Sequence, residues 1–164
     1  MKPFLDTNVL IYAVVAEDSH KQLVAQSLLS QTGIARPTLS PQILGEAYNV
    51  LTRKKRWAPA EAVAAVRLFA SLRLVVPSGE TVLLGLELAA QHGLSGWDAM
   101  VVQAALQGDC DTLFSEDLQA GRFGNLKVVN PFKLRAHEPV PPRVNPSPTP
   151  SLSLSLSGRR APRR

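Results

Sequence analysis

The chain has 164 residues, of which 45% are hydrophobic and 19% are charged, a balance typical of one folded domain and unlike that of a wholly disordered protein. The formal net charge of +5 comes from five arginines at or beyond Arg143; the other 13 basic residues balance the 13 acidic residues, all of which precede that position. The domain itself is therefore neutral, and contact with nucleic acid would depend on local basic patches.

Two further features of the sequence restrict the protein class. No apolar run reaches the roughly 18 residues of a membrane span, and Asp6 interrupts the segment that would be apolar in a signal peptide, so we expect a cytoplasmic protein without membrane contact. Cys110 is the only cysteine, which excludes an internal disulfide and argues against a thiolate zinc site. We expect it to be a small buried hydrophobe.

The first half of the chain predicts strands that alternate with helices. The predicted elements are a strand over residues 2–5, a helix over 9–15, a helix over 20–31, a strand over 34–39 and a helix over 41–56. The polar triplet Asp6-Thr7-Asn8 ends the first strand, and Gly33 stops the second helix. Ser40 followed by Pro41 predicts an N-cap and the first helical position.

The second half continues this alternation. The predicted elements are a helix over 60–72, a strand over 73–76, a helix over 80–92 ended by Gly93, a helix over 95–106, and strands over 112–115 and 126–129. This order indicates an α/β sandwich with a mainly parallel central sheet. In such sheets, ligands usually bind beyond the carboxyl ends of the strands.

The composition changes from Glu138 onward. Six prolines up to Pro150 prevent regular pairing, and a serine and leucine alternation then runs over residues 151–157. We therefore expect one domain over residues 1–137 and a disordered tail rich in proline, serine and arginine over residues 138–164.

Four acids occupy positions where carboxylates can converge. Asp6 follows the first strand, Glu46 lies in the helix over 41–56, Asp98 lies in the first turn of a later helix, and Asp117 follows the strand that ends at Ser115. Four carboxylates within roughly 5 Å would repel by about 3 kcal/mol per pair at an effective dielectric constant near 20. Such a cluster requires raised pKa values or divalent cations, and carboxylate ligands suit Mg²⁺ or Mn²⁺ rather than zinc.

Each acid also has a purely structural interpretation. Ser95 and Asp98 fit a capping box, and Asp117 fits the first turn of a helix, where the helix dipole favours acids. The triplet beginning at Asp6 is also typical of a polar turn. Glu46 lies at the edge of an apolar stripe and needs a partner, which a structural lysine or arginine can supply as well as a metal.

The combination of these motifs resembles the PIN-domain family, and in particular the VapC toxins. The motifs are Phe4-Leu5-Asp6-Thr7-Asn8-Val9-Leu10, Glu46 in a helix, Trp97-Asp98-Ala99, and Leu113-Phe114-Ser115-Glu116-Asp117-Leu118, in the family's order and across about residues 1–135. The resemblance implies a PIN-like α/β/α sandwich. The tail is the one departure, since family members usually end soon after the last strand.

The resemblance also implies a function and its residues. Asp6, Glu46, Asp98 and Asp117 would bind Mg²⁺ or Mn²⁺ and support hydrolysis of RNA phosphodiester bonds, while Asn8 and Ser115 would order the site. Glu116 is ambiguous, because an acid beside Asp117 can also reach a metal or a water. The implied partners are an RNA substrate, a cognate antitoxin of a type II toxin–antitoxin system, and a second copy in a homodimer.

The RNA must be held close to the acids despite their negative charge. The densest basic group is Arg53-Lys54-Lys55-Arg56, at the end of the Glu46 helix, and Arg122 is a second candidate. The structural alternative is a set of solvated cations that interact with a helix C-terminus.

Three other functions compete with the nuclease. A phosphoaspartate hydrolase would usually carry a second aspartate where Asn8 stands, and a receiver domain would have an adjacent acid pair at the end of its first strand. The rival from another class is a non-catalytic RNA-binding or protein-interaction module on the same fold. Metal-dependent RNA cleavage distinguishes that module from the enzyme.

Overall fold

The fold is an α/β sandwich around one six-stranded sheet. The structure is a computed structural model and describes residues 1–133. The strands are β1 (Pro3–Leu5), β2 (Thr38–Leu39), β3 (Arg73–Leu74), β4 (Thr112–Phe114), β5 (Gly121–Phe123) and β6 (Leu126–Val129). They lie in the order β3-β2-β1-β4-β6-β5, and all neighbours are parallel except β5 and β6. The predicted mainly parallel sheet is confirmed.

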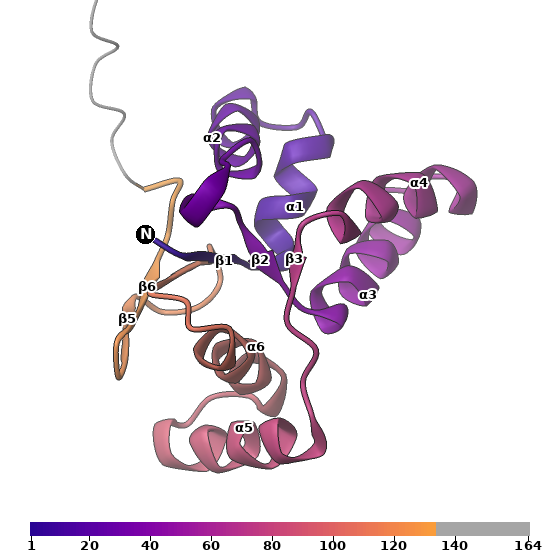
Figure 1. The fold of residues 1–164 in the computed structure, drawn as a ribbon. Coiled ribbons are helices and arrows are strands. Elements are labelled where there is room, and N and C mark those ends of the chain that lie inside the picture. Colours follow the sequence, from indigo (N-terminus) through magenta and orange to yellow (C-terminus); the bar gives the residue numbers. More distant parts are fainter. Residues whose placement is uncertain (134–164) are drawn as a thin grey trace, which may run out of the picture.

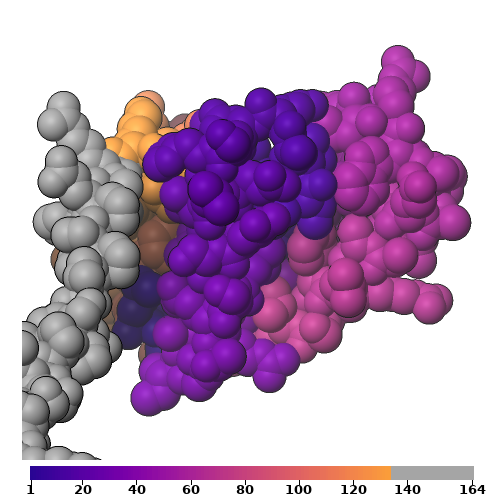
Figure 2. Space-filling model, turned by 90° about the horizontal axis from the view of Figure 1, so that it is seen from above, coloured from indigo at the N-terminus to yellow at the C-terminus, as the bar shows by residue number. Residues whose placement is uncertain are grey.

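Helices pack around this sheet. They are α1 (Thr7–Val14), α2 (Ser19–Leu29), α3 (Pro41–Asn49), α4 (Pro59–Ala70), α5 (Gly79–His92) and α6 (Gly96–Gln107). Figure 1 shows α1 and α2 on one side of the sheet, α5 and α6 on the other, and α3 with α4 beyond β2 and β3. Seen from above in Figure 2, the indigo and purple residues that include α1 and α2 face the viewer, and the magenta residues that include α3 and α4 lie beside them.

The core lies where the helices meet the two central strands. Its largest fully buried side chains include Phe4 and Leu5 of β1, Leu113 of β4, Leu10 of α1 and Ile43 of α3. Short apolar strands that are buried on both faces are expected in a parallel sheet covered by helices. Within residues 1–133, no helix is both long enough and apolar enough to cross a bilayer.

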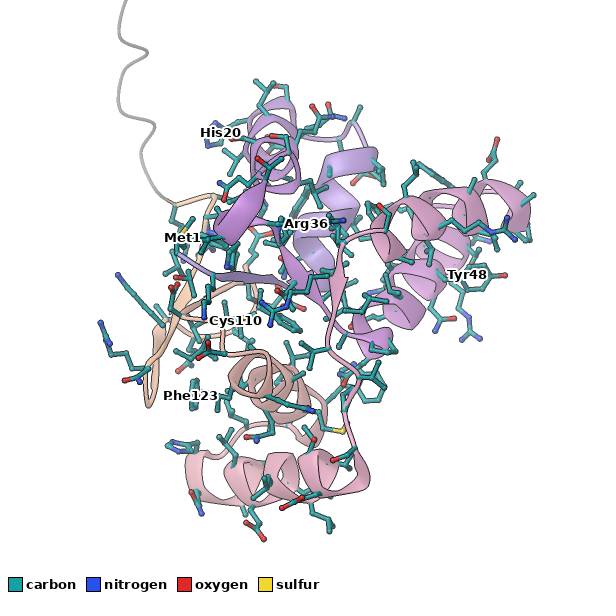
Figure 3. The ribbon with its side chains drawn as sticks, viewed as in Figure 1. Met1, His20, Arg36, Tyr48, Cys110 and Phe123 are labelled. Atoms are coloured by element: carbon teal, nitrogen blue, oxygen red, sulfur yellow. The ribbon has the colours of Figure 1, made fainter. Side chains whose placement is uncertain are left out.

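Several local predictions are confirmed. Gly93 ends α5 in the left-handed conformation with φ 66°, as a C-cap glycine does. The Ser95 hydroxyl accepts from the Asp98 amide and so caps α6. Cys110, labelled in Figure 3 just before β4, is buried with its thiol free.

Ser40 is the N-cap residue of α3 and Pro41 its first residue, as predicted, although the buried Ser40 hydroxyl makes no cap hydrogen bond and has no partner within the described part of the chain. Other local predictions are wrong. The strand expected over 34–39 is limited to Thr38–Leu39, because Gly33–Ala35 form a 3₁₀ turn. The helix expected over 41–56 leaves α geometry at Val50 and continues as a π-helix over Val50–Lys54. The hairpin strand β5 was not predicted.

The predicted domain boundary at residue 137 and the predicted tail over 138–164 lie outside the described residues.

Candidate active site at the carboxyl edge of the sheet

The order in which strands are added to the sheet reverses between β1 and β4, and the candidate site lies at this point. The chain runs outward from β1 to β2 and β3, and then returns to place β4 on the other side of β1. Ligands of parallel α/β sheets bind in the crevice that forms at such a switch point. Asp6 directly follows β1, and Ser115 to Asp117 directly follow β4, so both acidic segments meet there.

Asp6 lies at the centre of this crevice. Its carboxylate caps α1 by accepting from the Thr7 amide at 2.7 Å, and it also accepts from the Ser115 hydroxyl at 2.6 Å and the Asn8 side-chain amide at 3.3 Å. Burial raises the pKa of Asp6, and the charges of Glu46 and Asp117 raise it further against the lowering effect of the hydrogen bonds from Ser115 and Thr7. The site therefore holds this carboxylate in place although its ionised form is disfavoured.

Glu46 reaches the same crevice from α3. The Thr7 hydroxyl donates to Glu46 Oε2 at 2.8 Å, and the indole N–H of Trp97 lies 3.4 Å from the same oxygen. Ile43 and Ala47 are fully buried on the inner face of α3, and this packing fixes the direction of Glu46. Its partners are thus a hydroxyl and an indole, and neither of them neutralises its charge.

Asp117 completes the group on the β4 side. Its Oδ2 accepts from the Asn8 side-chain amide at 3.3 Å, so the amide of Asn8 lies between the carboxylates of Asp6 and Asp117. The buried Ser115 hydroxyl accepts from the amides of Asp117 and Leu118 while it donates to Asp6. Asn8 therefore donates to the carboxylates that follow β1 and β4, and Ser115 donates to the one that follows β1.

Asp98 is held in another way. The Ser95 hydroxyl donates to Asp98 Oδ2 at 2.7 Å, which completes the capping contact at the start of α6. Within residues 1–133, no hydrogen bond joins Asp98 to Asp6, Glu46 or Asp117. Its neighbour Trp97 does contact Glu46, and the Trp97 carbonyl accepts from the side chain of Gln42, so the start of α6 is fixed beside α3.

Glu116, the ambiguous acid, is engaged elsewhere. Its carboxylate accepts from Lys21 Nζ at 2.5 Å and from the Tyr12 hydroxyl at 2.7 Å. Although burial raises the pKa of Glu116, the hydrogen bonds from Lys21 and Tyr12 lower it overall. The Lys21 ammonium also lies 4.4 Å from the centre of the Tyr12 ring, where a cation is attracted to the ring face. Glu116 thus acts as an internal counter-ion to Lys21.

A pocket of about 210 Å³ opens beside the acids. Its lining includes the acids Glu46 and Asp117 and the cations Lys54 and Lys55. Lys55 is paired with Glu17, whereas Lys54 is exposed and has no acidic partner in the described part of the chain. The Arg53 and Arg56 side chains do not line this pocket.

Arg122, the other predicted RNA contact, lies apart from the pocket. It is an exposed residue of β5, the edge strand that is separated from β1 by β4 and β6. It faces Lys127 of β6 in the antiparallel register.

The chemistry of this donor set suits a magnesium or manganese ion, because the side chains supply hard oxygen ligands with unneutralised charge. The raised pKa of Asp6 is consistent with a site whose acids repel one another. Among residues 1–133, however, no three His, Cys, Asp or Glu side chains are close enough together to hold one ion. The residues therefore fit a divalent ion in the type of ligand atom they offer. Asn8 links Asp6 to Asp117, and Thr7 links Asp6 to Glu46.

Thr7 and Trp97 contact the site but were not identified as site residues from the sequence. Thr7 belongs to the triplet that drew attention to Asp6, and its polar side chain at the start of a buried helix was the available signal. Trp97 precedes Asp98, but nothing in the spacing indicated its contact with Glu46. Lys21 and Glu17 had no local signal, because their partners are distant in the chain.

Comparison with models of known protein families shows to which family the chain belongs. The model of the PIN domain matches residues 4–126, from the second residue of β1 to the first residue of β6. The chain therefore belongs to the PIN domain family. No curated protein matches the sequence.

Solved structures share the fold at low sequence identity. VapC20 of Mycobacterium tuberculosis, described as a toxin that cleaves the sarcin-ricin loop, is 22% identical and has a TM-score of 0.58, covering 70% of this chain and 91% of its own. A toxin–antitoxin complex from Klebsiella pneumoniae (18%, TM-score 0.58) covers 79% and 97%, and VapBC2 from Rickettsia felis, bound to a fragment of promoter DNA (20%, TM-score 0.57), covers 79% and 98%. At these identities, the likeness shows that the fold is shared with VapC-type PIN proteins.

Proposed function

We propose that this protein is a metal-dependent endoribonuclease, the toxin component of a type II toxin–antitoxin system of the VapC type. The observation that carries the proposal is the meeting of Asp6, Glu46 and Asp117 at the switch point of the sheet, with Thr7 and Asn8 between them. Membership of the PIN domain family supports it, as does the RNA-cleaving activity stated for the structurally similar VapC20.

Asp6, Glu46, Asp98 and Asp117 would hold Mg²⁺ or Mn²⁺. Such an ion, when bound, lowers the pKa of a water and stabilises negative charge on the scissile phosphate. The Ser95 hydroxyl donates to only one oxygen of Asp98, Oδ2, so the other oxygen of this carboxylate stays available to an ion.

Other residues of the chain orient these acids and hold the RNA. Ser115 fixes the Asp6 carboxylate, and the Thr7 hydroxyl fixes that of Glu46. Lys54 lies at the pocket beside them, where an ammonium can bind a backbone phosphate of RNA. Arg53, Lys55 and Arg56 extend the positive charge beyond the pocket.

A cognate antitoxin and a second copy of the chain are the proposed protein partners. The similar structure from Klebsiella pneumoniae is described as a toxin–antitoxin complex, which supports an antitoxin as partner. The exposed apolar side chains of Leu83, Leu84 and Leu86 on α5 give the chain a surface of the kind that binds other proteins.

Cleavage of a mixed RNA pool tests the enzymatic proposal. Purified protein should release fragments with Mg²⁺ or Mn²⁺ and none with EDTA. Asp6→Asn and Asp117→Asn should lose at least 100-fold in rate, because each removes a charged ligand of the ion. Glu87→Gln removes an exposed acid of α5 outside the site and is the matched control, which should retain the activity.

Binding of metal is measured separately, by the shift in melting temperature on addition of Mn²⁺. The wild-type protein should be stabilised, and Asp6→Asn should not. A folded protein that binds RNA without fragments under every metal condition would support the alternative, a non-catalytic RNA-binding or protein-interaction module on the PIN fold.

A further inference from the structure

A second pocket lies at the opposite edge of the sheet, where the parallel strands begin. Three neighbouring strands each bring a cation to this edge: Lys2 precedes β1, Arg36 lies two residues before β2, and Arg73 opens β3. The pocket has a volume of about 570 Å³, and its lining consists of Lys2, Gly33, Ile34, Arg36, Ser71, Leu72 and Arg73. Arg36 is labelled in Figure 3.

The guanidinium groups of Arg36 and Arg73 are each held by a hydrogen bond but keep unused N–H donors. Arg36 donates to the carbonyl of Ser71, and Arg73 Nη2 donates to the carbonyl of Gly108 at 3.1 Å. A guanidinium has five N–H donors, and within residues 1–133 each of these two makes only that one hydrogen bond. Both residues are exposed, so the remaining donors are available to a ligand.

Acids neutralise only part of this positive charge. Lys2 Nζ is paired with Asp109, and Asp111 accepts from the backbone amide of Lys2 at 2.9 Å. Neither carboxylate forms an ion pair with Arg36 or Arg73 in the described part of the chain. A planar guanidinium presents paired donors that match the oxygens of a phosphate group, and two of them on adjacent strands favour a phosphate as ligand.

Two apolar side chains, Ile34 and Leu72, also line the pocket. Ile34 is 79% exposed on the 3₁₀ turn above the pocket, although burial of such a side chain is favourable by roughly 2 kcal/mol. Leu72 is half-buried beside it. A volume of 570 Å³ is within the range of pockets that enclose small ligands, and an apolar wall beside two guanidinium groups suits a nucleobase or ribose next to its phosphate.

We propose that this pocket binds a nucleotide, with its phosphate on Arg36 and Arg73 and its base or sugar against Ile34. The pocket is separate from the acidic site, because Lys2 and Asp6 lie at opposite ends of β1, roughly 13 Å apart along an extended chain. This inference does not rest on the proposed nuclease activity. The nucleotide can be free or can be one residue of an RNA strand.

Titration of the full-length protein with adenosine monophosphate in EDTA tests the proposal, since EDTA removes divalent metal from the acidic site. We expect saturable binding at 50 mM salt that adenosine, which lacks the phosphate, does not reproduce. The double variant Arg36→Gln, Arg73→Gln should weaken this binding at least tenfold. Arg67→Gln removes an exposed arginine of α4 outside the pocket and is the matched control, which should bind normally.

Two further variants keep the test independent of folding defects. Asp109→Asn releases Lys2 from its ion pair and should tighten binding several-fold; asparagine tolerates the positive φ of 54° at this position. Ile34→Ser changes an exposed side chain and should weaken binding of adenosine monophosphate but not of inorganic phosphate. Melting temperatures identify any variant that fails to fold.

A ten-nucleotide RNA distinguishes the two sources of the nucleotide. Binding that is at least tenfold tighter than that of the mononucleotide, and equally sensitive to the double arginine change, assigns the pocket to an RNA strand. Equal affinities assign it to a free nucleotide. The proposal is overturned if neither ligand binds, or if their binding is unchanged in the folded double variant.

Discussion

At the scale of single residues, the burial of the Asp6 carboxylate lowers the stability of the folded state. The carboxylate is partly buried beside Glu46 and Asp117, and burial raises its pKa above the ordinary value of 3.8. The folded state therefore binds the proton of Asp6 more tightly than the unfolded state does. As the pH rises through the interval between the two pKa values, stability falls, and the loss is complete above the folded-state pKa.

Asp6→Asn should therefore stabilise the metal-free protein while it abolishes cleavage. Asparagine cannot ionise, and it remains a good N-cap for α1. We expect a gain of about 1 kcal/mol, which corresponds to a rise of roughly 3 °C in melting temperature at pH 7 in EDTA. A lower melting temperature for the variant in EDTA would contradict this account of the site.

The contact between Lys21 and Glu116 also contributes stability that is lost as the pH rises, but in a much more alkaline range. The hydrogen bond to Glu116, followed by that to Tyr12, raises the pKa of Lys21 above its ordinary value of 10.5. The stabilisation is fully present below pH 10.5 and is lost as the pH rises through the folded-state pKa. Lys21→Met should be less stable than wild type by about 1 kcal/mol at pH 8.

Urea unfolding at a series of pH values checks this prediction. The difference between wild type and Lys21→Met should stay constant from pH 7 to 10 and shrink above pH 10.5. A difference that persists undiminished to the alkaline limit of folding would show that Lys21 acts through packing on Tyr12 rather than through its charge.

At the scale of elements, the pairing of α5 and α6 depends on a small residue. A Cβ atom added to Gly85 of α5 would lie 3.3 Å from both Cα and Cγ of Met100 on α6. The Met100 backbone cannot move without shifting α6, which carries Trp97 and Asp98 at its start. The close approach of these two helices therefore bears on the position of the candidate site.

Gly85→Ala should destabilise the protein by roughly 1 to 3 kcal/mol, the usual cost of overpacking. Gly45→Ala in α3 is the matched control, since its added Cβ would meet nothing within 4 Å and alanine favours a helix by about 0.5 to 1 kcal/mol. Chemical denaturation of both variants should give changes of opposite sign. Equal changes would show that helix propensity outweighs packing at Gly85.

The sequence was informative about elements wherever local chemistry decides them. Apolar strands, the Gly93 C-cap and the Ser95 N-cap follow from side chains close together in the chain, and these were predicted correctly. The strand Gly121–Phe123 is largely exposed and exists only through its pairing with β6, so it has no apolar pattern of its own. The π-helix over Val50–Lys54 also has no sequence signal.

In the candidate site, too, features set by the local sequence were predicted, whereas contacts between distant residues were not. The positions of Asp6 and Asp117 at strand ends predicted their convergence, because parallel strands end at one edge of the sheet. The partner of Glu116 was not predictable, since Lys21 lies 95 residues earlier in the chain. The sequence likewise allowed two roles for Asp98, and the structure shows the capping contact with Ser95.

At the scale of the whole molecule, the charges are divided between the two edges of the sheet. The acids Asp6, Glu46 and Asp117 gather at the carboxyl edge, and Lys2, Arg36 and Arg73 gather at the amino edge. Beyond these edges, the sequence adds five arginines at or after Arg143. Under the proposed function, we expect RNA binding to combine contributions from these separate groups of basic residues.

Deletion of residues 138–164 should reduce the salt dependence of RNA binding. Each phosphate contact on single-stranded RNA adds about 0.7 to the slope of log affinity against log salt, so five arginines contribute up to about 3.5. Filter binding of one RNA at several salt concentrations measures both slopes. An unchanged slope would exclude the arginines of this segment from RNA binding.

The pairing of β1 with β4 has a consequence for synthesis of the protein in the cell. Pro3 is aligned with Thr112 and Leu5 with Phe114, so the first strand meets its central neighbour only after more than a hundred further residues have been translated. At 5 to 20 residues per second, this interval lasts roughly 5 to 20 s. A nascent chain thus carries Asp6 without Asp117 throughout this interval, and the acids of the candidate site can meet only after β4 has been synthesised.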